Sequence, residues 1–273
     1  MSRFTLKKLD TIIGITATSG LLFIKNVLFL ISDSSLFLYQ YDLSKKLLLK
    51  FPLVKDAEEN IKKAEKPDLE CITLHGNQLI ILGSGSTEKI CTMFTLHLSS
   101  DALQVQDLSA LYQKLKEIAS LTENQLNIEG AIYVNQTMLL FQRGNSKNSR
   151  NGIFIIPNHQ EGGIRFVPIS LPTLDDIETT FTDAILVDDK IYFLACAENT
   201  ASTYEDGEIL GTILGIMRAQ TFEIIEIHLL SEHQKFEGIT LYKESETEIS
   251  FLLCEDNDDE ALEAVISELT LIK

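Results

Sequence analysis

The sequence lacks most features that mark secreted or membrane-embedded proteins. Its four cysteines form no CxxC pair and are too sparse for a disulfide scaffold, so we expect reduced, buried thiols. The longest candidate for an apolar run, Leu21 to Ile31, is interrupted by Lys25 and Asn26 and is too short to span a bilayer. The N-terminal residues lack the order of a secretory signal peptide. These absences favour a soluble, cytoplasmic protein with no membrane partner.

Basic residues are also scarce. The chain has 23 lysines and arginines against 40 aspartates and glutamates, which gives a formal net charge of -17. Nucleic acids and anionic membranes are bound mainly through Lys and Arg, so a nucleic-acid partner is not expected. Two interpretations of the acidic surface stay open: it attracts cations, or it only keeps the protein in solution.

Common catalytic motifs are absent as well. Ser84, within Gly83–Ser86, does not match a nucleophile elbow, and the sequence has neither a GxGxxG fingerprint nor a P-loop. The five histidines have no metal-ligand spacing, and we expect them to be surface residues. The motifs therefore leave open whether the protein is an enzyme.

What the sequence does contain is an internal repeat. Each copy has an acidic residue, a small residue and then alternating apolar positions. The acids of four copies are Glu70, Glu129, Asp183 and Glu237, and a fifth copy, at Ser19, lacks the acid. Successive copies lie 51 to 59 residues apart. Such a near-constant spacing is typical of a fold built from equivalent supersecondary units.

Four of the five repeats have the pattern of four short strands, which is typical of one propeller blade. The last repeat has only three strands before Lys273, whereas Phe4–Leu9 has the pattern of an additional strand. Pairing between this N-terminal strand and the last blade would close the ring and remove two free sheet edges. The sequence thus predicts an all-β, five-bladed β-propeller with four-stranded antiparallel blades, closed by its N-terminal strand.

We expect residues 1–273 to form a single propeller domain. Its inner strands are predicted to begin near residues 19, 70, 129, 183 and 237. Two insertions interrupt the strand pattern: an amphipathic helix over Ser109–Ser120 and a charged helix or loop over residues 55–66. Both connect the outer strand of one blade to the inner strand of the next.

The inner strands of a propeller run parallel around its axis, so the acids at their starts should converge at the mouth of the central channel. Carboxylates about 4 to 6 Å apart raise one another's pKa values unless a cation, a basic side chain or backbone N–H groups offset the charge. Oxygen ligands suit Ca²⁺ or Mg²⁺ better than zinc. The predicted metal ligands are Glu70, Glu129, Asp183 and Glu237. Two alternatives stay open: the acids only accept hydrogen bonds from inner-strand N–H groups and hold the blades together, or they take part in catalysis.

The loops between the second and third strands of each blade should lie on the same face as these acids. They carry the predicted ligand-binding residues, which are Arg143, Asn145, Asn199 and Asp256. Arg143 could hold a carboxylate or a phosphate with two hydrogen bonds, or it could offset the charges of Glu129 and Glu70. Both roles stay open at this point.

Four phrases carry a resemblance to known proteins: KPDLE at Lys66–Glu70, LNIEGA at Leu126–Ala131, FQRGN at Phe141–Asn145 and KFEGI at Lys235–Ile239. Over nearly the whole chain, the sequence resembles an uncharacterised bacterial β-propeller family found largely in Bacteroidetes. More distantly, the repeated acid-Gly-Ile element is similar to phytase-like esterase propellers, which are calcium-dependent phosphoesterases. That resemblance implies that the four repeated acids match the phytase acids and that Arg143 contacts phosphate. The chain departs from phytases, which have six blades and a strongly basic substrate pocket.

These observations together predict a monomeric cytoplasmic propeller that binds a small molecule, together with Ca²⁺ or Mg²⁺, at the acidic channel mouth. One alternative is a metal-dependent hydrolase of phosphate esters or lactones; for a lactone, the cation would polarise the substrate carbonyl. Another is a protein-interaction scaffold, because one fold hosts many unrelated functions.

Overall fold

The computed structural model describes residues 4–87, 90–122, 124–145, 149–157, 163–199, 207–255 and 262–273. Within these residues the chain forms five four-stranded antiparallel sheets and one two-stranded hairpin. The protein is therefore a five-bladed β-propeller, as the repeat predicts. By its internal contacts the chain divides into two compact units, residues 1–69 with 235–273, and residues 70–234. The expected single domain over residues 1–273 stays a prediction.

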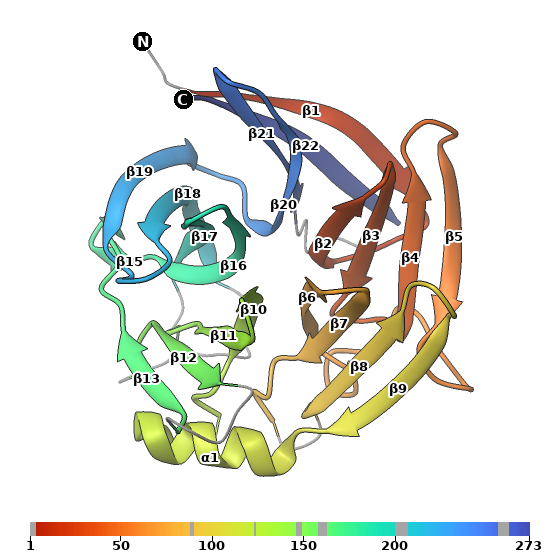
Figure 1. The fold of residues 1–273 in the computed structure, drawn as a ribbon, viewed down its shortest axis with the longest axis horizontal. Helices are drawn as coiled ribbons and strands as arrows, with labels where there is room; N and C mark the ends of the chain where they lie inside the picture. The colour runs from red at the N-terminus through yellow and green to blue at the C-terminus, as the bar shows by residue number, and fades with distance from the viewer. Residues whose placement is uncertain are drawn as a thin grey trace. The chain divides into compact units, whose positions relative to one another are not determined.

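The first unit contains the sheet that joins the two ends of the chain. Its strands lie in the order β20 (Phe236–Glu244), β21 (Glu248–Glu255), β22 (Glu263–Ile272) and β1 (Phe4–Ile13). β1 runs antiparallel to β22, from Phe4 opposite Leu271 to Ile13 opposite Glu263. Figure 1 shows β1, at the red end of the colour scale, alongside the dark blue β22. The predicted closure by the N-terminal strand is confirmed.

The second sheet of the first unit has its strands in chain order. They are β2 (Thr18–Ile24), β3 (Val27–Ser32), β4 (Phe37–Asp42) and β5 (Leu47–Pro52). Its inner strands β2 and β3 are apolar and buried, whereas β5 is largely exposed. Leu21 and Leu30 of this sheet share a buried cluster with Leu252 and Ile266 of the other sheet. The unit is thus held together by apolar side chains between its two sheets.

The second unit has three four-stranded sheets, each again in chain order. Their strands are β6 (Leu69–His75), β7 (Gln78–Gly83), β8 (Thr92–His97), β9 (Ala102–Asp107), β10 (Ile128–Val134), β11 (Thr137–Gln142), β12 (Gly152–Pro157), β13 (Arg165–Pro168), β16 (Thr180–Val187), β17 (Lys190–Asn199), β18 (Glu208–Arg218) and β19 (Ile224–Ser231). A small hairpin of β14 (Thr173–Leu174) and β15 (Ile177–Glu178) precedes β16. The two units meet in the chain inside β6, between Leu69 and Glu70.

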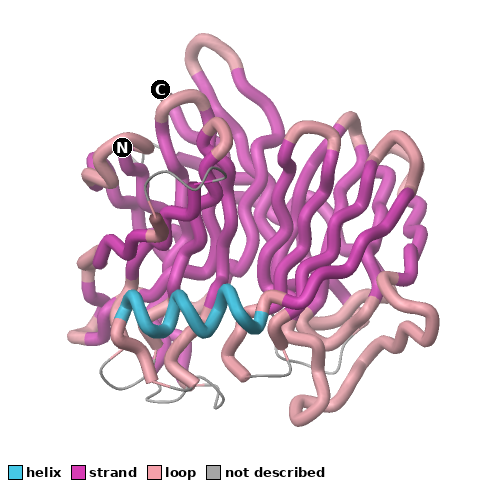
Figure 2. The backbone as a smooth tube through the Cα atoms, turned by 60° about the horizontal axis from the view of Figure 1, so that its bottom comes forward, coloured by secondary structure: helices cyan, strands magenta, loops and turns pink. Residues whose placement is uncertain are grey.

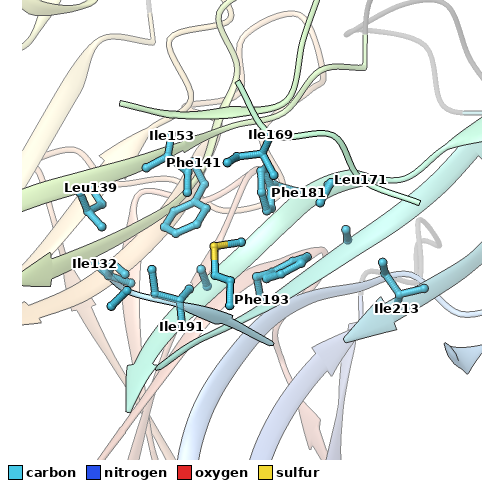
Figure 3. Close-up of a cluster of buried hydrophobic side chains, with 14 residues drawn as sticks. Ile132, Leu139, Phe141, Ile153, Ile169, Leu171, Phe181, Ile191, Phe193 and Ile213 are labelled. Atoms are coloured by element: carbon cyan, nitrogen blue, oxygen red, sulfur yellow. The ribbon is translucent and has the colours of Figure 1, made fainter. Parts of the chain in front are cut away.

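Aliphatic and phenylalanine side chains fill the core of the second unit between the β10–β13 and β16–β19 sheets (Figure 3). The ring centroids of Phe141 and Phe181 lie 5.3 Å apart at an interplanar angle of 76°. Those of Phe181 and Phe193 lie 5.2 Å apart at 73°. Both are edge-to-face contacts, which add about 0.5–1.5 kcal/mol per pair to the gain from burial. This core fixes the starts of β10 and β16, where the predicted acids lie.

Helix α1 (Ser109–Ala119), cyan in Figure 2, confirms the predicted amphipathic helix. It buries Tyr112, Leu115 and Ala119. The Tyr112 hydroxyl donates to the carbonyl oxygen of Gly83 at 2.7 Å. Gly85 has a φ of +73°, and a Cβ there would lie 2.3 Å from the Tyr112 ring, so only glycine fits this turn. Within the described part of the chain, no helix is long and apolar enough to cross a membrane.

The inner strands β2, β10, β16 and β20 each carry a β-bulge near their first residues. The strand register shifts across one residue in β2, β10, β16 and β20, and the bulged residues are Ser19, Glu129, Thr182 and Glu237. A bulge turns a side chain away from the regular alternation and is common beside functional sites. In β16 the bulge lies one residue before Asp183, so Thr182 occupies the position that Glu129 has in β10. Asp183 instead occupies the position of Gly130, which the sequence repeat did not reveal.

Candidate functional site

Arg143 lies directly after β11 and is only 6% exposed. Its Nη1 donates to Oε1 of Glu129 at 3.2 Å, and its Nη2 donates to Oε2 of Glu198 at 2.6 Å. Its Nε donates to Oγ1 of Thr180 at 3.2 Å. The guanidinium therefore offsets two buried carboxylates and connects three strands, β10, β16 and β17. A charge-assisted contact of this kind is strong because the surroundings exclude water.

The two carboxylates that hold Arg143 have further donors. The side-chain amide of Asn127 donates to Oε1 of Glu129 at 2.7 Å, and the Gly207 N–H donates to Oε1 of Glu198 at 2.7 Å. Glu129 and Glu198 are 3% and 8% exposed. Buried ions are tolerated when each is paired and hydrogen-bonded in this way. Glu198 was not among the residues predicted from the sequence.

Cys71 shows the electrostatic influence of three predicted acids. Burial raises the pKa of its thiol well above the usual 9.0, and the negative charges of Asp183, Glu129 and Glu70 raise it further. The thiol donates to the carbonyl oxygen of Ile128 at 3.6 Å. A protonated, fully buried thiol is not a nucleophile. All four cysteines are buried and none forms a disulfide, as predicted.

The other predicted acids have partners close to them in the chain. The Asp183 carboxylate accepts a hydrogen bond from the Ala184 N–H at 2.7 Å. Oε1 of Glu237 lies 2.8 Å from Nζ of Lys235, and both side chains are less than a tenth exposed. Such contacts are those expected if the acids stabilise the bulged starts of the inner strands.

A group of carboxylates that could share one cation is found at the start of β6. Asp33, Asp68 and Glu70 each offer an oxygen, and these oxygens all lie within 4.8 Å of one another. Asp33 follows β3, Asp68 immediately precedes β6, and Glu70 is the second residue of β6. Asp68 adopts a φ of 51°, a left-handed conformation that Asp tolerates better than most residues. Its N–H donates to the Asp33 carbonyl at 2.8 Å, which holds the two residues together.

A lysine already touches this group, which we call the Asp33 cluster (Asp33, Asp68 and Glu70). Nζ of Lys66 lies 2.5 Å from Oδ2 of Asp33 and 2.9 Å from Oδ1 of Asp68. The side chains of Lys66, Asp33 and Asp68 are 21%, 19% and 10% exposed. The second oxygen of Asp33, Oδ1, is buried and has no hydrogen-bond partner. The cluster is thus partly neutralised and partly unsatisfied.

The predicted site residues are distributed unevenly. Of the four predicted metal ligands, Glu70 belongs to the Asp33 cluster, whereas Glu129 contacts Arg143 and Glu237 contacts Lys235. Asn145 is half-buried and its Oδ1 has no hydrogen-bond partner, and Asn199 is exposed at the end of β17. Asp256 lies outside the described residues.

Asp33 and Asp68 were not predicted as candidate metal ligands, although the sequence holds a signal for each. Asp68 precedes the predicted ligand Glu70 by two residues, so both side chains can reach the same end of the strand. Asp33 lies in the loop between the second and third strands of its blade, on the face where the inner strands begin. The cluster could have been predicted by looking for an acid in the loop between the second and third strands of the blade that precedes a repeated acid.

Comparisons with known proteins agree with the fold. The structure is similar to that of a glutaminyl cyclase from Myxococcus xanthus, with a TM-score of 0.54 and 12% identity over 98% of this chain and 97% of that chain. It is also similar to the α-L-arabinofuranosidase PaAbf62A from Podospora anserina, solved with cellotriose, with a TM-score of 0.54 and 8% identity over 94% and 91% of the two chains. A luciferin-regenerating enzyme matches with a TM-score of 0.51 and 8% identity, over 97% of this chain and 95% of that chain. Identities this low show the fold alone.

No curated protein matches the sequence. The likeness to phytase-like esterases and to Bacteroidetes proteins stays a prediction. A family model, described as a family of unknown function (DUF6929), matches residues 14–271. The match covers nearly the whole chain, including the starts of all five inner strands. The chain therefore belongs to this family of unknown function, DUF6929.

Proposed function

We propose that the protein binds a divalent cation, Ca²⁺ or Mg²⁺, at Asp33, Asp68 and Glu70, and that a small-molecule ligand completes the coordination of that cation. The observation that carries this proposal is the group of three carboxylate oxygens within 4.8 Å of one another, one residue of which has a buried, unpartnered oxygen. We extend the proposal to a cytoplasmic monomer with neither a nucleic-acid nor a membrane partner, because the net charge is -17 and the cysteines are reduced.

The geometry of the oxygens suits a hard cation. Two oxygens on opposite sides of Ca²⁺, with bonds of about 2.4 Å, lie about 4.8 Å apart. Asp33 and Asp68 share one ammonium group, that of Lys66, and a divalent cation would place further positive charge beside their carboxylates and that of Glu70. Carboxylate oxygens without His or Cys favour Ca²⁺ and Mg²⁺ over zinc. Three protein ligands would leave positions on the cation for water or for a ligand.

The contacts favour binding over hydrolysis. A phosphoesterase or lactonase needs a cation and a second polar group placed on the substrate. The guanidinium of Arg143 is engaged with Glu129, Glu198 and Thr180, and the ammonium of Lys66 with Asp33 and Asp68. Two of the structural neighbours are named as a glutaminyl cyclase and an arabinofuranosidase, but fold similarity does not transfer an activity.

Titration calorimetry with CaCl₂ and MgCl₂ on the chelator-treated protein tests the proposal. We expect one cation per chain, a higher melting temperature with the cation, and a loss of binding in Asp33→Asn. Asp42→Asn is the matched control, because Asp42 contacts Lys45 in the turn after β4 at 2.9 Å but lies outside the Asp33 cluster. Absence of binding by the unmodified protein, or equal losses in both variants, would refute the proposal. A ligand screen by melting temperature, with and without the cation, then tests the small-molecule part.

A further inference from the structure

The connection between β5 and β6 lies along the loop that carries Asp33. We call residues 54–67 the strap. The Leu36 N–H donates to the Glu58 carbonyl at 3.0 Å, and the Ile61 N–H donates to the Ser34 carbonyl at 2.9 Å. Backbone hydrogen bonds on both sides of Glu59 therefore fix the first half of the strap to the β3–β4 loop.

Side chains strengthen the same half of the strap. Glu59 accepts a hydrogen bond from the Tyr39 hydroxyl at 2.6 Å and contacts Nζ of Lys50 at 2.8 Å. The Thr16 hydroxyl donates to Oδ1 of Asn60 at 2.8 Å. The strap is thus anchored near its middle, independently of the Asp33 cluster.

Lys66, in the second half of the strap, places a positive charge among the carboxylates. Its ammonium contacts one oxygen of Asp33 and one of Asp68, while the other oxygen of Asp33 is unpartnered. A cation bound at these oxygens and the ammonium would compete, because both need the same acceptors and both are positive. The Lys66 side chain is about one-fifth exposed and has a flexible stem, so it can reach water without disturbing the anchored half.

From these contacts we infer that Lys66 is a built-in competitor of the divalent cation, and that cation binding releases the second half of the strap, residues 62–67. The inference rests on the proposed function and adds its regulation. The ammonium stabilises the cluster in the cation-free protein and sets a threshold concentration that the cation must exceed. The anchors at Glu58–Ile61 confine the movement to the residues that follow them. Cation occupancy is thereby converted into a local change of the surface next to the site.

The test compares the cation affinity of four proteins by titration calorimetry: the unmodified chain, Lys66→Met, Lys66→Arg and Lys50→Met. Removing one charge from the cluster should raise the affinity of Lys66→Met for Ca²⁺ or Mg²⁺ by about tenfold or more. Lys66→Arg should keep the original affinity within about threefold, because it restores the charge. Lys50→Met removes the ion pair between Lys50 of β5 and Glu59 of the strap, which lies outside the cluster, and should change the affinity less than twofold.

Hydrogen exchange supplies a second, independent measurement. Adding the cation to the unmodified protein should increase exchange in residues 62–67 and leave residues 58–61 unchanged. If the unmodified protein binds the cation and Lys66→Met binds it equally well, the inference is wrong and the proposed function stands. If neither protein binds a cation, the proposed function fails and the inference fails with it. Circular dichroism of each variant shows whether it is folded before the comparison is made.

Discussion

The molecule offsets clustered acids in two different ways. Around Arg143, the carboxylates of Glu129 and Glu198 are nearly inaccessible, and each also accepts a hydrogen bond from an amide group. In the Asp33 cluster, Lys66 is one-fifth exposed and one carboxylate oxygen has no partner. The first arrangement is complete, so a ligand could enter only by breaking it. The second is incomplete, so a cation can exchange there at a smaller cost.

The largest expected effect comes from removing the guanidinium group of Arg143, which is the positive charge of the first arrangement. Arg143→Met leaves Glu129 and Glu198 buried without their ion pair, which should reduce the free energy of unfolding by about 3–5 kcal/mol. Urea denaturation measures this loss. Arg218→Met is the control, because Arg218 and Glu223 are both more than half exposed and such a pair contributes less than about 1 kcal/mol. Equal losses in the two variants would show that the Arg143 network is not structural.

A smaller loss of stability is expected when one carboxylate is removed from each of the two acidic groups in turn. Glu198→Gln removes a charged acceptor from Arg143 and should lower the free energy of unfolding by about 1.5–3 kcal/mol. Asp33→Asn, in cation-free buffer, should change it by less than about 1 kcal/mol, because repulsion among the carboxylates decreases while Lys66 keeps Asp68. Both values come from urea denaturation in the presence of chelator. A larger loss for Asp33→Asn than for Glu198→Gln would mean that the Asp33 cluster, and not the Arg143 network, contributes more to stability.

The smallest effect concerns Asp10 of β1, a partly exposed acid that is offset in yet another way. Burial raises the pKa of Asp10, but hydrogen bonds from Lys46, Tyr41 and the Thr11 N–H outweigh it and hold the pKa below the usual 3.8. A depressed pKa stabilises the folded state above the pKa of the unfolded chain, and this contribution disappears as the pH falls through the folded value.

The stability difference between the unmodified protein and Asp10→Asn should therefore be constant from neutral pH down to about pH 5 and should shrink below pH 3.8. Urea denaturation at several pH values measures it. A difference that grows on acidification would mean that the ionised form of Asp10 is not the stabilising one.

The fold could be predicted because its signals are repeated and local. The alternating apolar positions recur in every blade, and the strand at Phe4–Leu9 has a partner only if the ring closes. The helix over Ser109–Ser120 was found from its spacing alone, and the structure ends it one residue earlier, at Ala119. Repetition reduces the error of each local assignment, because five copies must agree.

The site was harder to predict because its contacts are not repeated. Glu198 reaches Arg143 from a position 55 residues further along the chain, and no copy of the repeat has an equivalent pair in the sequence pattern. The bulge of β16 lies one residue earlier than the repeat suggests, so Asp183 is not equivalent to Glu129. A bulge inserts one residue into a strand without changing its composition, and so leaves no clear trace in the sequence.

The pairing of β1 with β22 has a consequence for the order of events in the cell. Residues 4–13 leave the ribosome before the rest of the propeller, yet their partner strand, residues 263–272, is synthesised after all the other strands of the propeller. Domains generally begin to fold during synthesis, but this sheet can be completed only after translation has passed residue 272. Until then β1 is an unpaired strand with exposed backbone groups. The growing chain must keep that strand from pairing with others, so slow translation of the codons just before those of residues 263–272 should increase aggregation more than slow translation near the middle of the propeller.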